Sequence, residues 1–156
     1  MLTDCKAGLV TFTVETVGDW ARDANLLVRE HWQELGLDLD LEISPDIERM
    51  KIMEQAGAFY IVACRDHGKL VGYLLAVFSR HLHYSTSPPM FIVDAYYLDP
   101  EYRTGNGAKM MKFAESLAKQ LGAIKMYLSC KVHEDHSALF ERMGYRLSDY
   151  AFIKRI

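Results

Sequence analysis

The segment of the sequence best suited to binding a ligand is a glycine-containing turn, which lies between an apolar run and a helical pattern. Residues 98–111 read LDPEYRTGNGAKMM, so Gly105 and Gly107 come just before the helical stripe that begins at Met110. A turn that opens a helix directs unpaired backbone N–H groups and the positive end of the helix dipole at one point. Because glycine lets an anion approach the backbone, the turn predicts a phosphate-binding site. A lone Gly-x-Gly also fits an ordinary strand-to-helix connection.

Two common phosphate-binding motifs do not match this turn. A Walker loop requires Gly-Lys-Ser/Thr at its end, whereas Gly107 is followed by Ala108, Lys109 and Met110. A dinucleotide-binding fingerprint requires a third glycine where Met110 stands. We therefore expect neither a Walker-type nucleotide site nor a Rossmann site.

One carboxylate is a candidate for acid–base chemistry. Asp94 lies inside the apolar run 91–98, where burial of an unpaired charge would be costly. We expect it to reach a cleft, a partner or water, acting as a general base, as an anchor for an amine, or only as a structural hydrogen-bonding group.

The histidines do not predict a metal site. His81 and His83 alternate beside Tyr84 and would share one face of an extended strand. Two histidines without a nearby third ligand seldom bind a metal, so we expect them to line a cleft or to be exposed. His133 and His136 have helical spacing beside acidic residues and are expected at the surface.

The elements that must position these residues follow from hydrophobic periodicity. Strands are predicted over 9–14, 59–64, 70–78, 90–98 and 124–130, with one or two more over 145–156, and helices over 19–35, 44–57, 105–121 and 136–143. Ser44 is the expected N-cap of the second helix. Several antiparallel strands precede a strand–helix–strand unit. The prediction is an α+β fold with a mixed, mostly antiparallel central sheet flanked by helices on both faces.

Composition limits the remaining function classes. A chain of 156 residues, half of them hydrophobic, has the size of one domain, and we expect residues 1–156 to form it. The net charge of −3 argues against nucleic acid as a partner. Three widely spaced cysteines, Cys5, Cys64 and Cys130, suggest neither disulfides nor zinc. The cysteine pattern fits a reducing cytoplasm, and because no apolar run is long enough to cross a membrane, we expect a soluble protein.

The element order and the glycine turn resemble the GNAT acetyltransferase family, whose signature Q/R-x-x-G-x-G/A follows the fourth strand and opens the third helix. The resemblance is strongest over 93–145, where VDAYYLDPEYR and FERMGY match family segments. The loop HLHY at 81–84 resembles, more weakly, acetyltransferases of bacteriophages. The signature can be aligned with this sequence in two registers. If Gly105 and Gly107 are aligned with the glycines of the signature, Tyr102 occupies its Gln/Arg position. If Arg103 is aligned with the Gln/Arg position instead, Asn106 replaces the first glycine of the signature. We favour the first register because it keeps both glycines.

The resemblance implies acetyl-CoA as the co-substrate and assigns residues to it. Leu98 would provide the backbone donor for the oxyanion, and Tyr97 with Leu98 would pair with the pantetheine arm. Phe140 would lie in the cofactor site, where the family often has a tyrosine as general acid. The substitutes are three tyrosines, which on apolar strands more often belong to the core, and one cysteine: Tyr145, Tyr127, Tyr97 and Cys130. Arg103 or Lys109 would add positive charge. The backbone amides that would hold the pyrophosphate belong to Arg103, Thr104, Gly105, Asn106, Gly107 and Ala108.

The resulting hypothesis is an N-acetyltransferase that moves an acetyl group to a primary amine by direct transfer in a ternary complex, without a metal. Direct transfer is favoured because Cys130 has no adjacent His or Asp that would activate it. The alternatives are a catalytically silent acyl-CoA-binding or interaction module and a domain that binds no nucleotide. The acidic stretch 38–42 would attract a cationic acceptor or form a solvated connection. The expected acceptor is a small molecule, a peptide or a protein. Because members of the resembled family are commonly homodimers, a homodimer is also an expectation.

Overall fold

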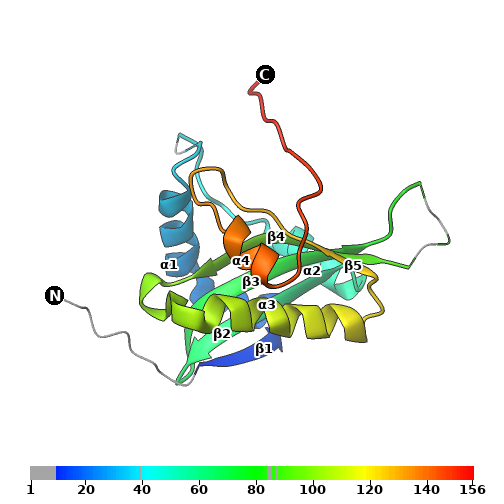
Figure 1. Ribbon diagram of the computed structural model, residues 1–156. Coiled ribbons are helices and arrows are strands. Elements are labelled where there is room, and N and C mark those ends of the chain that lie inside the picture. The colour runs from blue at the N-terminus through cyan, green and yellow to red at the C-terminus, as the bar shows by residue number, and fades with distance from the viewer. Residues whose placement is uncertain (1–9, 39, 84–85, 87) are drawn as a thin grey trace.

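The computed structural model describes residues 10–156 except 39, 84, 85 and 87, and its core is one five-stranded sheet (Figure 1). The strands lie side by side in chain order, antiparallel from β1 to β4, with β5 parallel to β4. The strands are β1 (Thr11–Glu15), β2 (Phe59–Asp66), β3 (Lys69–Ser79), β4 (Met90–Leu98) and β5 (Lys125–Tyr127). The helices are α1 (Val17–Leu35), α2 (Ile47–Gln55), the short 3-10 helix η1 (Pro100–Tyr102), α3 (Arg103–Gln120) and α4 (Ser137–Arg142).

Helices cover both faces of this sheet, which confirms the predicted fold class. The apolar stripe of α1, including Val17 and Trp20, is buried against one face, and α2 packs beside it. The stripe of α3, including Met110 and Ala114, packs on the opposite face together with Phe140 of α4. In Figure 1, α3 and α4 lie in front of the sheet, with α1 and α2 on the other side. Two apolar layers therefore hold β3 and β4 between them.

Local signals explain where the first helices begin and end. The Thr16 side chain accepts a hydrogen bond from the Asp19 amide and caps the N-terminus of α1, and Gly36 ends the helix at φ 63°. The N-cap of α2 is Asp46 instead of the predicted Ser44, because its carboxylate accepts the Arg49 amide at 3.0 Å. The second helix therefore begins at Ile47, later than predicted.

The predicted end of the sheet is wrong in two respects. The strand predicted over 124–130 is only three residues long, and no strand forms over 145–156. The Tyr145 hydroxyl donates to the Glu115 carboxylate, which holds the start of this segment on α3. Near its end, Arg155 forms ion pairs with Asp38 and Asp40. The segment consequently leads away from β5 (Figure 1).

Candidate active site

The site is centred on an edge of β4 that β5 leaves open. The two strands pair only over Met90–Ile92 with Lys125–Tyr127, whereas β4 continues to Leu98. Within the described residues, the outer edge of 93–98 has no strand partner. Backbone N–H and C=O groups on such an edge are free to pair with an extended ligand.

The ladder between β3 and β4 determines which backbone groups face the open edge. The Asp99 amide donates to the Val71 carbonyl at 2.9 Å, so the neighbouring pair of Gly72 and Leu98 is a non-hydrogen-bonded one. The backbone groups of Leu98 therefore turn away from β3, as do those of Tyr96 two residues earlier, whereas those of Tyr97 face β3. Alternation thus assigns the open edge to Tyr96 and Leu98.

Asp94 lies at an irregularity in the same strand. Leu75 is opposite Ala95 and Ala76 is opposite Val93, so Asp94 is the extra residue of a β-bulge. Its side chain is exposed and has no hydrogen-bond or ion-pair partner among the described residues. The bulge thus explains how a carboxylate stands in an apolar strand without the cost of burial. It also leaves the carboxylate accessible next to the open edge.

The glycine turn breaks the first turn of α3. Thr104 has ψ 100° and Gly105 has φ 75°, so regular helix begins only at Asn106. The Asn106 side chain is buried, and its amide donates to the Tyr102 carbonyl at 2.9 Å, which fixes the turn from inside. A Cβ built on Gly105 or Gly107 would have no heavy atom within 4 Å outside its neighbouring residues. The outer side of the turn is therefore open, at the point where unpaired helix amides gather.

Arg103 has a structural partner close to this turn. Its Nε donates to the Leu98 carbonyl at 2.9 Å, and its other end binds the Glu34 carboxylate at 2.5–2.7 Å. The guanidinium carbon lies 5.5 Å from the centre of the Tyr97 ring. Arg103 thus joins the end of β4 to α1, which leaves the exposed Lys109 as the cation of the turn with no such partner among the described residues.

Aromatic side chains support β4 from the α1 face. His31 stacks on Tyr97 at 4.9 Å between ring centres and lies 2.7 Å from the Tyr73 hydroxyl. Burial lowers the pKa of His31 to about 4. Sequence reasoning did not identify His31, because an isolated histidine in an amphipathic helix gives no signal of its partners on two strands.

A second group missed from the sequence lies on the α4 face. The Tyr96 hydroxyl is 3.0 Å from Nδ1 of His136, and both rings meet Phe140 edge-on. The sequence pattern assigned His136 to the surface, and its ring is indeed exposed, but the contact with Tyr96 joins segments 40 residues apart. Such a contact becomes visible only when the sheet and α4 are assembled.

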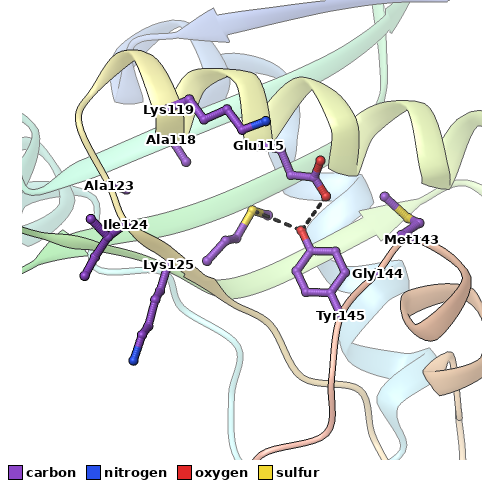
Figure 2. A pocket seen from close by; sticks show the side chains of 10 residues that line it. Glu115, Ala118, Lys119, Ala123, Ile124, Lys125, Met143, Gly144 and Tyr145 are labelled. Carbon is purple, nitrogen blue, oxygen red and sulfur yellow. Dashed lines mark hydrogen bonds between the residues drawn. The ribbon is translucent and has the colours of Figure 1, made fainter.

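Tyr145, another predicted catalytic residue, directs its hydroxyl into a different pocket. Its hydroxyl donates to Glu115 at 2.8 Å and contacts the Met126 sulfur at 3.3 Å, and burial together with Glu115 raises the pKa of this hydroxyl. It lines a pocket of about 260 Å³ between the second half of α3, β5 and residues 143–145 (Figure 2). Met126 is opposite Phe91, at the other end of β4 from Leu98. The Tyr145 hydroxyl therefore has its partners towards that end, although the Tyr145 ring packs edge-on against Phe140 at 6.1 Å between ring centres.

The remaining histidines lie in three different surroundings: His67, His133, and the pair of His81 and His83. His81 and His83 have ring centres 5.1 Å apart and are exposed, while Tyr84 is outside the described residues. His133 lies 2.7 Å from the Leu35 carbonyl and joins the segment after β5 to the end of α1. Within the described part of the chain, no cluster of three or more His, Cys, Asp or Glu residues is arranged to bind a metal. None of the helices described there is both long and apolar enough to span a bilayer.

The chain is similar to known acetyltransferases in sequence and in fold. The model of the acetyltransferase (GNAT) family matches residues 15–145. A crystal structure of ribosomal-protein-alanine N-acetyltransferase from Brucella melitensis biovar Abortus 2308 is 20% identical, with a TM-score of 0.71 over 94% of this chain and 99% of that one. An aminoglycoside acetyltransferase from an uncultured soil metagenomic sample is 14% identical, with a TM-score of 0.72 over 94% and 96%.

A third similar structure is glucosamine-6-phosphate N-acetyltransferase from Arabidopsis thaliana, which is 16% identical with a TM-score of 0.69 over 93% of this chain and 98% of that one. A search of curated protein sequences gives no match. The names of the three structures specify three different acceptors, so likeness of fold alone does not select one for this chain.

Proposed function

The chain belongs to the GNAT acetyltransferase family, and from this premise we propose that it transfers an acetyl group from acetyl-CoA directly to a primary amine. The observation that carries the proposal is the continuity of two binding features. The open edge of β4 leads, through η1, into a glycine turn whose outer side is unobstructed. An extended thioester carrier with a diphosphate needs both features in this order.

The residues of the turn suit a diphosphate. Amides of 104–108 would hold its oxygens at the start of α3, with Lys109 adding charge. The Arg103 amide, predicted to join them, donates instead to the Pro100 carbonyl. Both glycines lack Cβ atoms on the side from which the ligand would approach. The carrier supplies the activated acetyl thioester, and the backbone groups of Tyr96 would pair with its pantetheine arm along β4, because the Leu98 carbonyl already accepts a hydrogen bond from Arg103. Phe140 would form an apolar wall of the same site.

The open edge also offers groups for the transfer itself. The Leu98 N–H faces the edge and would stabilise negative charge on the acetyl oxygen in the transition state. Asp94 would accept a proton from the attacking amine, because its carboxylate is exposed and has no partner among the described residues. Reaction within one ternary complex places both reactants by binding and requires no covalent enzyme intermediate.

The acceptor is proposed only as an amine. The acidic stretch between α1 and α2 would favour a cationic one, although Arg155 already pairs with Asp38 and Asp40. Polyamines, aminoglycosides, amino acids, peptide N-termini and protein lysines are the classes to compare. A homodimer is a further expectation, which light scattering of the purified protein would test.

Calorimetry with CoA, combined with a thiol-release assay on a panel of these amines, tests the proposal. We expect binding of CoA and acetyl-CoA, and release of CoA that depends on at least one amine. Binding without turnover on any amine would instead favour the runner-up, a catalytically silent acyl-CoA-binding or interaction module. Absence of binding at millimolar CoA would contradict both.

A further inference from the structure

The group formed by Tyr96, His136 and Phe140 has a specific arrangement beside the open edge of β4. The Tyr96 oxygen is 3.0 Å from Nδ1 of His136. The Phe140 ring centre lies 6.1 Å from that of Tyr96 and 6.3 Å from that of His136. Phe140 itself is buried and offers no polar atom. Tyr96 therefore supplies the hydroxyl of this group, and His136 orients it.

Tyr96 lies in the part of β4 assigned to the ligand, and its hydroxyl extends from there to His136. β5 stops opposite Ile92, so Tyr96 lies in the unpaired part of β4, midway between Asp94 and Leu98. His136 reaches it from the N-terminus of α4, and its exposed ring has access to water. The three β4 residues thus line one short stretch of the open edge.

Burial, with a smaller effect of nearby charges, keeps the Tyr96 hydroxyl protonated. Burial is the largest effect, and Cys130 and Glu134, in the segment between β5 and α4, add to it; together they raise the pKa of the Tyr96 hydroxyl above its ordinary value of 10. Across the neutral range the side chain therefore retains its proton. If Nδ1 of His136 carries a hydrogen, it donates to the Tyr96 oxygen and leaves the hydroxyl proton free to point towards a ligand.

We propose that Tyr96 is the general acid that protonates the departing thiolate and that His136 is its positioning residue; this role rests on the acetyl transfer proposed above. The amine nitrogen bonds to the acetyl carbon, the carbon–sulfur bond breaks, and its electron pair goes to sulfur. Sulfur takes the Tyr96 proton, the phenolate regains one from Nδ1 of His136, and Nε2 of His136 takes one from water. The proton lost by the amine leaves through Asp94.

The test begins with Tyr96→Phe, which removes one oxygen and keeps the ring against Phe140. We expect kcat to fall about 100-fold, a typical contribution of a general acid, with Kd for CoA unchanged within about twofold. Tyr60→Phe is the matched control, because Tyr60 also packs edge-on against a phenylalanine, Phe78. It should keep the wild-type kcat. An unchanged kcat in Tyr96→Phe, or a loss explained by weaker CoA binding, would overturn the proposal.

A second variant distinguishes a chemical role from a structural one. Phe140→Tyr added to Tyr96→Phe returns a hydroxyl to the same group of rings, and we expect it to restore at least about tenfold in kcat. Should Tyr96→Phe fail to fold, His136→Gln replaces it as the test and should lower kcat about 10-fold while leaving CoA affinity intact. If the double variant does not regain kcat, or if His136→Gln keeps the wild-type kcat, the general acid is a different residue.

A spectroscopic readout is independent of turnover. The nitrogen-15 chemical shifts of the His136 ring in the free protein should identify the form with hydrogen on Nδ1, and Tyr96→Phe should weaken this preference. Hydrogen on Nε2 alone would mean that Tyr96 donates to His136, and the proposal would fail. Failure of the acetyl transfer itself is separate: it appears as wild-type protein without CoA release on any amine.

Discussion

At the scale of single residues, Gly105 and Gly122 provide a matched pair at the two ends of α3. Both have left-handed backbone, φ 75° and 82°, and a Cβ at either position would find open space. Alanine at each should cost about 1–2 kcal/mol of unfolding free energy, because L-residues disfavour this conformation. Only Gly105→Ala should also weaken CoA binding, about fivefold or more, because the strained turn redirects its amides. Urea denaturation and calorimetry measure both effects; equal CoA affinity in the two variants would contradict the assignment of the turn.

Asp94 gives a second prediction at the same scale. Asp94→Asn retains the shape of the exposed side chain but removes the base, so kcat should fall about 100-fold while Kd for CoA stays the same. Asp149→Asn, in the C-terminal segment, is the control and should have no effect. Steady-state kinetics measures kcat, and calorimetry measures Kd for CoA, in the wild-type protein and both variants. A parallel loss of CoA affinity in Asp94→Asn would point to a structural role.

The local backbone accounts for the two residues that the sequence singled out most clearly. The bulge explains why Asp94 tolerates an apolar strand, and the left-handed φ of Gly105 explains why glycine stands there. Their predicted roles stay predictions. Tyr96 was missed because its partner His136 comes from another element, and Arg103 has an ion-pair partner, Glu34, 69 positions away. Contacts of this separation leave no pattern in a single sequence.

At the scale of elements, the end of β4 depends on its fit against β3. A Cβ on Gly72 would lie 2.7 Å from the Leu98 side chain and 2.8 Å from the Tyr97 carbonyl, closer than real atoms approach. Gly72→Ala should therefore destabilise the protein by about 1–3 kcal/mol and displace the Leu98 backbone. Gly18→Ala is the contrasting variant: it sits in α1, where the nearest atom is 3.8 Å away, and alanine should stabilise by roughly 0.5–1 kcal/mol. If thermal unfolding showed that both variants change stability in the same direction, the proposed fit between β3 and β4 would be wrong.

Helices and strands with a strong hydrophobic periodicity were predicted well, whereas the C-terminal segment, whose periodicity is weak, was not. The hairpin of β2 and β3, the apolar stripe of α1 and the long helix α3 all match the expectations. The segment 145–156 alternates enough to predict strands, yet Tyr145 and Arg155 have partners on other elements. Tertiary contacts therefore decided the structure of a segment whose local preference is for extended backbone.

At the scale of the whole molecule, burial of His31 makes stability depend on pH. Its folded-state pKa of about 4 lies below the ordinary 6.5, so between these values the unfolded chain binds more protons. Stability should fall as pH decreases from 6.5 to 4, by on the order of 1–2 kcal/mol once screening of the partly exposed ring is included. Urea denaturation at pH 7 and pH 4.5 should reveal this loss in wild-type protein and a smaller one in His31→Gln. His67→Asn, at an exposed position, should retain the wild-type dependence; an identical dependence in all three proteins would exclude His31 as the cause.

If the chain transfers acetyl groups from acetyl-CoA as proposed, one ligand must lie along β4 and across the glycine turn. Nitrogen-15 NMR of the backbone amides during titration with CoA tests this most directly. We expect saturable shifts at Tyr96, Leu98 and 103–109, and small changes around the pocket of Tyr145 and Glu115. Shifts confined to that pocket, or none at millimolar CoA, would contradict the account.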